Sequence, residues 1–519
     1  MALLNFCQPN VYRNNLRNRF LTASALLRNS CLHSSLVLEQ WSLAPDKNFE
    51  EPSCQKPDSS GCSGIPKQPF YLYWRYRKNQ TNWCAFSPPL TKNSDSMVHA
   101  RLIFIFTCLF AKMALIHAEE ASYGISGNPG AVNILTGTGE LGNLLQIPKS
   151  SGFRLGGLWM GDYNALLSGG DGTHHNRRWT GNSLFILDLS IDLQKAVGWN
   201  NAFFGAEFLQ FNGQPTNADV GVVQGYNSLP GAPPLNRSEL YQLWIRQEFL
   251  DNKLSVRIGK TVPTYHFNNV SKPVPKENPA ISIPSVSGLI YTPIFVNTTL
   301  LGAIGGYYNS VYGFVITIAP IKQAYINIGV FDGNLARGVQ TGLTGPHFNG
   351  YYFSIIEGGY GWTSPKPGIA AIGGWYQSGL LESGSQKDHG TGGVYAFGSQ
   401  ALWIKESYTT NKGNISGFFQ LGWNNSKTLP MNLFVGMGLT AFALVQKRPN
   451  DSFGVGVAWS RLNPHTFSRY SEWMFQGYYQ AQVYSSIYFQ PVLSYIPNPG
   501  AHPTKSNVVA FTGRLTVLF

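Results

Sequence analysis

The chain ends in Val509-Ala510-Phe511-Thr512-Gly513-Arg514-Leu515-Thr516-Val517-Leu518-Phe519, and this stretch decides the fold. One alternate set of its residues is apolar apart from a Gly, and the other is mainly small or polar and contains Arg514. Successive side chains of a β-strand point to opposite faces, so the pattern predicts a strand with one apolar and one charged face. About ten residues is the length that a tilted strand needs to cross a bilayer. We therefore expect a membrane-crossing strand with Leu515 towards lipid and Arg514 towards the interior.

Sixteen segments of this kind can be paired along the chain. In one example, Leu254, Val256 and Ile258 alternate with polar residues just after Asp251-Asn252, which suits a hairpin turn. Pro491 lies inside a later segment, where we expect a bulge or local break because proline cannot donate a ladder hydrogen bond. The predicted strands lie near residues 153–167, 180–193, 200–212, 236–249, 252–262, 310–320, 323–332, 348–359, 367–377, 391–408, 413–424, 431–445, 451–461, 470–484, 486–496 and 505–519.

The connections between these segments fall into a short set and a long set. The short set comprises 194–199, 250–251, 321–322, 409–412, 446–450 and 485, and the long set comprises 171–179, 213–235, 263–309, 333–347 and 378–390. Short periplasmic turns and long external loops are typical of outer-membrane barrels. A sheet in hydrocarbon must also close, because unpaired backbone groups are costly there. The sequence therefore predicts an all-β protein, a closed antiparallel transmembrane β-barrel of about 16 strands over 153–519, with long external loops that fold into the lumen.

The composition agrees with this fold and excludes several other classes. Charged residues are 12% of the chain and aromatic residues 14%, with 56 glycines, which is too little charge for an ordinary soluble surface. No apolar run of about 20 residues could cross a bilayer as a helix. The net charge of +12 is concentrated before position 119, because the later residues hold 25 Lys and Arg against 20 Asp and Glu. We therefore expect no nucleic-acid partner.

The segment 97–118, MVHARLIFIFTCLFAKMALIHA, has the features of a signal peptide. A weakly basic start precedes an apolar core, and we expect cleavage after Ala118, which leaves 119–152 as a short periplasmic segment. Residues 1–96 hold five of the six cysteines and show no sustained periodicity. We interpret them as a non-native, disordered upstream extension that precedes the true start at Met97. A genuine additional domain is the alternative.

Several segments, in the right order, resemble the carbohydrate-selective porin family (OprB-like). They are LYQLWIRQEFLDNKLSVRIGK at 240–260, GVGVAWSRLNP at 454–464, and the end from YYQAQVYSSIYFQPVLSYIPNPG to GRLTVLF. The resemblance covers roughly 150–519. It implies a sixteen-stranded outer-membrane barrel, often a monomer, that passes glucose and other small sugars. The chain departs from the family at Gln242 and Arg246, where we expect acidic residues, and lacks a Trp-Gly-Gly opening.

The alternation selects residues that would face solutes in the lumen. Sugar hydroxyls donate and accept hydrogen bonds, so paired guanidinium and carboxylate groups can replace their hydration. An aromatic side chain can cover the C–H face of a pyranose. In the alternative interpretation, the charged residues pair across strands and hold the wall in shape. The candidates are Asp188, Asp192, Glu207, Trp244, Arg246, Glu248, Arg257 and Arg514.

The long connections 213–235 and 263–309 have the length to fold inward. The second carries six prolines over 263–293 that stiffen it, so we expect it to form the constriction on which selectivity depends.

Other functions fit the sequence less well. A general diffusion porin is the main alternative, followed by a soluble β-rich sugar-binding protein, which would not need a signal peptide. An energy-coupled transporter would need a folded N-terminal plug, and no Ser–His spacing suggests an enzyme. Without a Cys-x-x-Cys pair we expect no metal site, and we expect no cofactor. The expected partners are small neutral carbohydrates, outer-membrane lipid and, through Phe519, the outer-membrane assembly machinery. We expect a monomer, with a trimer as the alternative.

Overall fold

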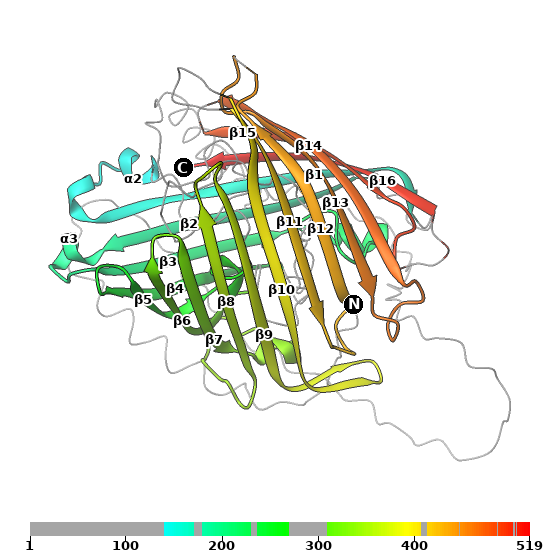
Figure 1. Ribbon diagram of the computed structural model, residues 1–519, viewed down its shortest axis with the longest axis horizontal. Helices are drawn as coiled ribbons and strands as arrows, with labels where there is room; N and C mark the ends of the chain where they lie inside the picture. The colour runs from blue at the N-terminus through cyan, green and yellow to red at the C-terminus, as the bar shows by residue number, and fades with distance from the viewer. Residues whose placement is uncertain are drawn as a thin grey trace, which may run out of the picture. The chain divides into compact units, whose positions relative to one another are not determined.

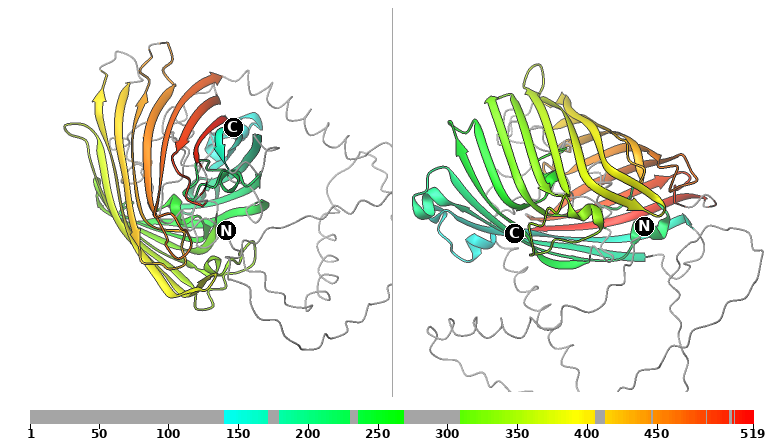
Figure 2. Two further views of the ribbon diagram at one scale, coloured as in Figure 1. Left: turned by 90° about the vertical axis from the view of Figure 1, so that its right-hand side faces the viewer. Right: turned by 90° about the horizontal axis from the view of Figure 1, so that it is seen from below.

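The structure, a computed structural model, describes residues 140–170, 179–229, 236–268, 309–405, 413–445, 447–484, 486–501, 504 and 506–519. Within these ranges sixteen strands form one closed antiparallel barrel, in which each strand pairs with its sequence neighbours and β1 pairs with β16 (Figures 1 and 2). This confirms the predicted fold class and number of strands. The strands are β1 (Phe153–Gly170), β2 (Trp179–Asp192), β3 (Ala202–Asn212), β4 (Arg237–Phe249), β5 (Leu254–Thr261), β6 (Val311–Ile321), β7 (Ala324–Asp332), β8 (Tyr352–Trp362), β9 (Gly368–Ser383), β10 (Gln386–Ile404), β11 (Asn414–Asn424), β12 (Met431–Phe442), β13 (Ser452–Leu462), β14 (Ser471–Tyr484), β15 (Ile487–Ile496) and β16 (Ser506–Leu518).

Strand β16 has the orientation that its alternation predicts. Arg514 is only 2% exposed and lies opposite Asp162 of β1, whereas Leu515 is 37% exposed. Thr512 and Thr516, on the same face as Arg514, are also buried. Pairing of the last strand with the first leaves no open sheet edge, as a sheet surrounded by hydrocarbon requires.

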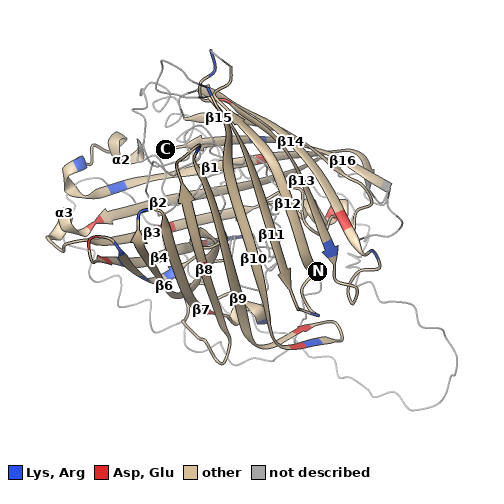
Figure 3. Ribbon diagram, viewed as in Figure 1, with Lys and Arg blue, Asp and Glu red and all other residues tan. Residues whose placement is uncertain are grey.

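The outward face of the barrel is apolar and rich in aromatic residues. Ile356, Ile372 and Val455 are among its exposed side chains. Aromatic rings stack on this face, for example Phe475 on Tyr495 of the neighbouring strand. Lys, Arg, Asp and Glu are sparse along the strands (Figure 3). This is the distribution of a surface that faces lipid.

One predicted connection is wrong. Residues 378–390 do not form a loop, because β9 continues to Ser383 and β10 begins at Gln386. The two strands pair with each other here, as in Asp388 with Leu381. A two-stranded ribbon that extends past its neighbours has no lipid-facing side, so its sequence needs no apolar alternation. The alternation of apolar and polar residues therefore stops before β9 ends and starts only after β10 has begun.

Pro491 lies in β15 without a register shift. The pairing with β16 runs through Pro491 and Gly513, but the pairing with β14 is interrupted at Gln490 and Pro491. The expected local break therefore occurs on one side only, where proline lacks the N–H that the ladder would use.

The inner wall is less polar than alternation alone suggests. Inward side chains of β1 to β4 meet residues of the long connections in a buried apolar cluster, which confirms that these connections fold into the lumen. Its members are Leu158, Met160, Leu184, Ile186, Leu209, Phe211, Leu229, Tyr241, Val262 and Tyr265. Because such connections must bury their own apolar residues, part of the wall serves to pack them and does not face water.

Short helices accompany the strands. They are α2 (Glu140–Leu144), η2 (Lys149–Ser151), α3 (Leu193–Val197), α4 (Thr216–Val220), η3 (Pro263–Tyr265) and η4 (Asn334–Arg337). Among the residues described, no helix is long and apolar enough to cross a membrane. The expected signal peptide at 97–118 and the extension at 1–96 lie outside the described residues, and so does most of the segment 119–152.

Candidate functional site

Four neighbouring strands, β2 to β5, bring six of the eight candidate residues together on the inner wall. Strand register places Asp188 opposite Glu207, Glu207 opposite Gln242, and Arg246 opposite Arg257. Asp188 and Glu207 are 3% and 2% exposed. Cross-strand neighbours of this kind have Cβ atoms about 5 Å apart, so carboxylate and guanidinium groups share one patch. We call Asp188, Glu207, Trp244, Arg246, Glu248 and Arg257 the charged wall.

A β-bulge in β4 sets the orientation of this patch. The register with β3 shifts between Glu207 and Phe208, so that Tyr241 and Gln242, although adjacent in sequence, are both fully buried. An extra residue of this kind lets two consecutive side chains point the same way. From Gln242 onward the alternation places Trp244, Arg246 and Glu248 towards the lumen.

Aromatic rings hold both guanidinium groups of the charged wall. Arg257 lies over the Trp244 ring, 3.8 Å from its centroid, and Arg246 lies 4.4 Å from the centroid of Phe203. Arg246 Nη2 also contacts Glu248 Oε1 at 3.1 Å. Stacking on an aromatic face fixes the plane of a guanidinium while its edge stays available to hydrogen-bond acceptors.

The Trp244 ring needs a glycine beneath it. A Cβ atom on Gly205, the residue opposite Trp244 in register, would come within 2.2 Å of the indole. Gly205 therefore gives the ring room to lie flat along the wall.

Several buried polar atoms of the charged wall have no hydrogen-bond partner within the described ranges. They are Asp188 Oδ2, Glu207 Oε2, Trp244 Nε1 and Arg246 Nε. Buried polar groups in proteins are nearly always satisfied by protein, water or ligand. These four atoms therefore leave donor and acceptor positions open among the described residues of the charged wall.

The remaining two candidates have other roles. Asp192 lies at the end of β2, where its carboxylate caps α3 by accepting from the backbone N–H groups of Gln194 and Lys195. Arg514 donates from Nε and Nη2 to the two carboxylate oxygens of Asp162, at 2.7 and 2.8 Å. Arg514 thus pairs across strands and Asp192 caps a helix, and contact of either residue with a solute stays a prediction.

A segment of the long connection 213–235 crosses the inside of the barrel. Residues 213–229, which we call the strap, leave β3 and reach the inner faces of β13 and β14. Gln224 accepts a hydrogen bond from Ser460 Oγ and donates one to the backbone oxygen of Glu472. Near its other end, Asn227 donates to Asp162 and Asn164, and Ser228 accepts from Arg514. The strap therefore narrows the lumen.

The connection 263–309, which we predict to form the constriction, can be followed only at its start. His266 accepts at its backbone oxygen from Asn327, and the backbone N–H of Asn268 donates to Glu357. Glu357 also accepts from the hydroxyl groups of Tyr325 and Tyr395. These contacts direct the connection into the lumen. Residues 269–308 lie outside the described residues, so the constriction at this connection stays a prediction.

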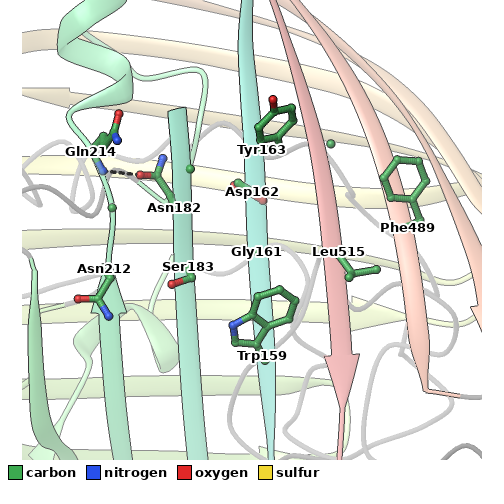
Figure 4. A pocket seen from close by; sticks show the side chains of 13 residues that line it. Trp159, Gly161, Asp162, Tyr163, Asn182, Ser183, Asn212, Gln214, Phe489 and Leu515 are labelled. Atoms are coloured by element: carbon green, nitrogen blue, oxygen red, sulfur yellow. Dashed lines mark hydrogen bonds between the residues drawn. The ribbon is translucent and has the colours of Figure 1, made fainter. Parts of the chain in front are cut away.

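A pocket of about 690 Å³ lies away from the charged wall (Figure 4). It is lined mainly by outward-facing residues of β1, β2, β15 and β16, among them Tyr163, Phe489 and Leu515, which are all exposed. At its rim the backbone N–H of Gln214 donates to Asn182 Oδ1 at 2.6 Å. This pocket is a feature of the lipid-facing surface and not of the lumen.

Sequence reasoning missed several inward-facing carboxylates, of which Asp162, Glu357 and Glu472 make the most contacts across the barrel. Each is the one acidic residue of the interior of a long strand-forming segment, which is a usable signal because a lone charge in such a segment needs a partner. Their partners lie far away in sequence, and no local pattern identifies them. The described residues contain no group of three or more His, Cys, Asp or Glu side chains that would hold a metal ion.

Comparison with known proteins shows which family this chain is similar to. The model of the carbohydrate-selective porin, OprB family, matches residues 183–519. Porin B of Pseudomonas aeruginosa is 23% identical over 478 residues, which cover 82% of this chain and all of that protein. The high-pH structure of Pseudomonas putida OprB is similar with a TM-score of 0.63 and 17% identity, over 74% of this chain and 98% of that one.

These matches confirm the resemblance found in the sequence segments. The porin family and the closed barrel mark the molecule as a channel rather than an enzyme. Because the family model covers well over half of the chain, we conclude that this protein is an outer-membrane porin that belongs to the carbohydrate-selective OprB family.

Proposed function

We propose that small neutral sugars diffuse passively through the lumen and are contacted there by the charged wall, without any chemical reaction. The observation that carries this proposal is the combination of Trp244, stacked by Arg257, with two carboxylates that each keep one unpartnered oxygen among the described residues. A sugar presents hydroxyl groups around its rim. The charged wall offers carboxylate and guanidinium groups to these hydroxyls, and Trp244 holds the Arg257 guanidinium in place for them.

The charges of the charged wall suit a neutral solute. Asp188 and Glu207 lie opposite each other, as do Arg246 and Arg257, so each sign is concentrated and the two signs are adjacent. A hydroxyl group can accept from a guanidinium and donate to a carboxylate at once, whereas an ion meets attraction from one pair and repulsion from the other. This arrangement favours hydroxyl-rich solutes over simple salts.

The test is single-channel recording in a planar bilayer with glucose or maltose added. We expect stepwise conductance that sugar reduces, and Arg246→Ala should weaken the sugar block at least about tenfold, the effect of losing one hydrogen bond to a charged group. Arg461→Ala, at an exposed position on β13, is the matched control and should leave the block unchanged.

The same recordings separate the alternatives. Conductance that no sugar affects would support a general diffusion porin, and a product that is inert in bilayers would contradict both. An unchanged block in Arg246→Ala would assign Arg246 to maintenance of the wall.

We further propose that the exported protein starts at Met97 and is cleaved after Ala118, and that the barrel functions as a monomer in outer-membrane lipid after Phe519 has served assembly. Intact mass of the protein purified from outer membranes tests the cleavage site, and its mass in detergent tests the oligomeric state. A mass that includes residues 1–96 would contradict the proposed start.

A further inference from the structure

We propose that the carboxylate of Glu472, which we call the latch, holds residues 221–224, the tip of the strap, across the lumen. This contact sets the current through the open channel. Glu472 lies at the start of β14, whereas the strap leaves the barrel wall from β3; β15, β16, β1 and β2 separate the two strands around the ring. The inference rests on the proposed channel function, because it concerns how wide the path is.

The Glu472 side chain is fully buried and accepts backbone hydrogen bonds from two connections. Val223 N lies 3.0 Å from Oε2, and Gln224 N lies 2.9 Å from Oε1. Gly500 N, in the connection between β15 and β16, donates to Oε2 at 2.6 Å. A carboxylate has four acceptor sites and no donor, so it matches a set of converging N–H groups.

The other contacts of the strap tip surround this carboxylate. Ala501 N donates to the backbone oxygen of Gly221, and the side chain of Val223 packs with Met431 and Leu462 in a small buried cluster. Val220 and Val222 also belong to the large buried cluster of the inner wall, but apolar packing of this kind is not directional. The hydrogen bonds from Val223 N and Gln224 N to Glu472 add a directional hold on these two residues.

The base of the strap is held separately. Asn217 braces the strap internally: its side-chain oxygen accepts from Tyr226 N and Asn227 N, and its amide donates to the backbone oxygen of Asn227. Thr216 contacts Thr180 and Asn182 on β2. Because these contacts do not involve Glu472, loss of the latch should release the tip and leave the base in place.

The chemistry of the latch predicts the effect of a minimal change. In Glu472→Gln, one carboxylate oxygen becomes an NH2 group, which would point donor hydrogens at backbone N–H donors. Buried N–H donors without acceptors destabilise the arrangement in which Glu472 holds the tip. When the tip leaves Glu472, these N–H groups can form hydrogen bonds with water. The neutral glutamine keeps the size of the side chain, so the barrel wall itself should persist.

The first experiment compares single-channel conductance of the wild type, Glu472→Gln and the control Asp388→Asn. Asp388 is also a buried carboxylate that accepts backbone N–H groups, from Lys427 and Thr428, but it holds a connection between neighbouring strands rather than a segment that crosses the lumen. We expect an upward shift in conductance and greater open-channel current noise for Glu472→Gln, and wild-type values for Asp388→Asn.

The second experiment measures release directly and does not depend on sugar or current. A Cys introduced by Val223→Cys sits in the latched tip, and the chain after position 108 has no other cysteine. We expect a maleimide to label this thiol at least about tenfold faster when Glu472→Gln is also present, which corresponds to loss of about one hydrogen bond to a charged group. If Glu472→Gln fails to fold, Gln224→Pro removes a backbone N–H donor to Glu472 without changing the wall, and it should raise conductance and labelling in the same direction.

Wild-type conductance of the Glu472→Gln channel, or of the Gln224→Pro channel if the first does not fold, would overturn the proposal. Faster labelling would then assign Glu472 to the order of the loop alone. Failure of the proposed function looks different: sugar would not block any variant, while the labelling difference would persist.

Discussion

Two regions of the inner wall contain the same kinds of charged residue but arrange them differently. At the seam between β1 and β16, Asp162 and Arg514 satisfy each other through two short hydrogen bonds and take hold of the strap through Asn227 and Ser228. On the charged wall of β2 to β5, carboxylates face carboxylates and guanidinium groups face guanidinium groups. Opposite charges that lie opposite each other on neighbouring strands satisfy each other's hydrogen bonds, whereas like charges in that arrangement leave polar atoms without a partner among the described residues. The sign of the charges that face each other, more than the residue type, therefore distinguishes the structural ion pair from the proposed solute contacts.

The largest expected effect is at the seam. Asp162→Ala leaves the buried Arg514 guanidinium without its main partner, and breaking a buried ion pair in this way costs about 3–5 kcal/mol. We expect that loss in the free energy of unfolding, measured from the urea midpoint of the barrel in detergent micelles. The double variant Asp162→Leu with Arg514→Leu removes both charges and should recover most of it. A loss below about 1 kcal/mol in the single variant would remove the distinction between the two regions.

The intermediate effect is on the charged wall. Trp244→Ala removes the ring on which the Arg257 guanidinium stacks, so the sugar block should weaken by about 0.5–1 kcal/mol, or about two- to fivefold. The urea midpoint should shift much less than in Asp162→Ala. Trp459→Ala, on the outer face of β13, provides the control with the same residue change. An equal loss of sugar block in both variants would argue against a specific aromatic contact.

The smallest effect is expected outside the lumen. Lys387 and Glu382 form an ion pair on the β9–β10 ribbon, with side chains 60% and 31% exposed. Glu382→Ala should change the free energy of unfolding by less than about 1 kcal/mol, because solvent screens an exposed pair. The change in the free energy of unfolding is measured from the urea midpoint and compared with the change in Asp162→Ala. A loss as large as that at the seam would mean that burial does not govern the strength of these pairs.

Much of the fold could be predicted because period-two alternation is a local property. It placed Arg514 inward and Leu515 outward, and it located all sixteen strands, although β9 ends six residues later and β10 begins five residues earlier than predicted. The bulge in β4 shows its limit. Strict alternation from Tyr241 would put Leu243 in the lumen, but the extra residue returns Gln242 and Trp244 to it. A bulge leaves little trace in sequence, since it depends on the neighbouring strand.

The candidate site was predictable in part for the same reason. Trp244, Arg246 and Arg257 lie on adjacent strands of one local hairpin, so alternation and a short turn suffice to bring them together. The partner of Arg514 is Asp162, at the other end of the barrel sequence, and the contact exists only once the barrel closes. The hold of Glu472 on Val223 is equally remote. Contacts across large sequence separations depend on the whole ring, which no local pattern specifies.

The β9–β10 ribbon offers a practical use of the molecule. Residues 380–383 and 386–389 pair only with each other, and the turn between them, Gly384-Ser385, pairs with no other strand. Exposed tips of this kind tolerate inserted peptides, since the added chain disturbs no ladder. A short antibody epitope placed between Gly384 and Ser385 would display foreign sequence on intact bacteria, and its staining would report which end of the cylinder meets the outside world.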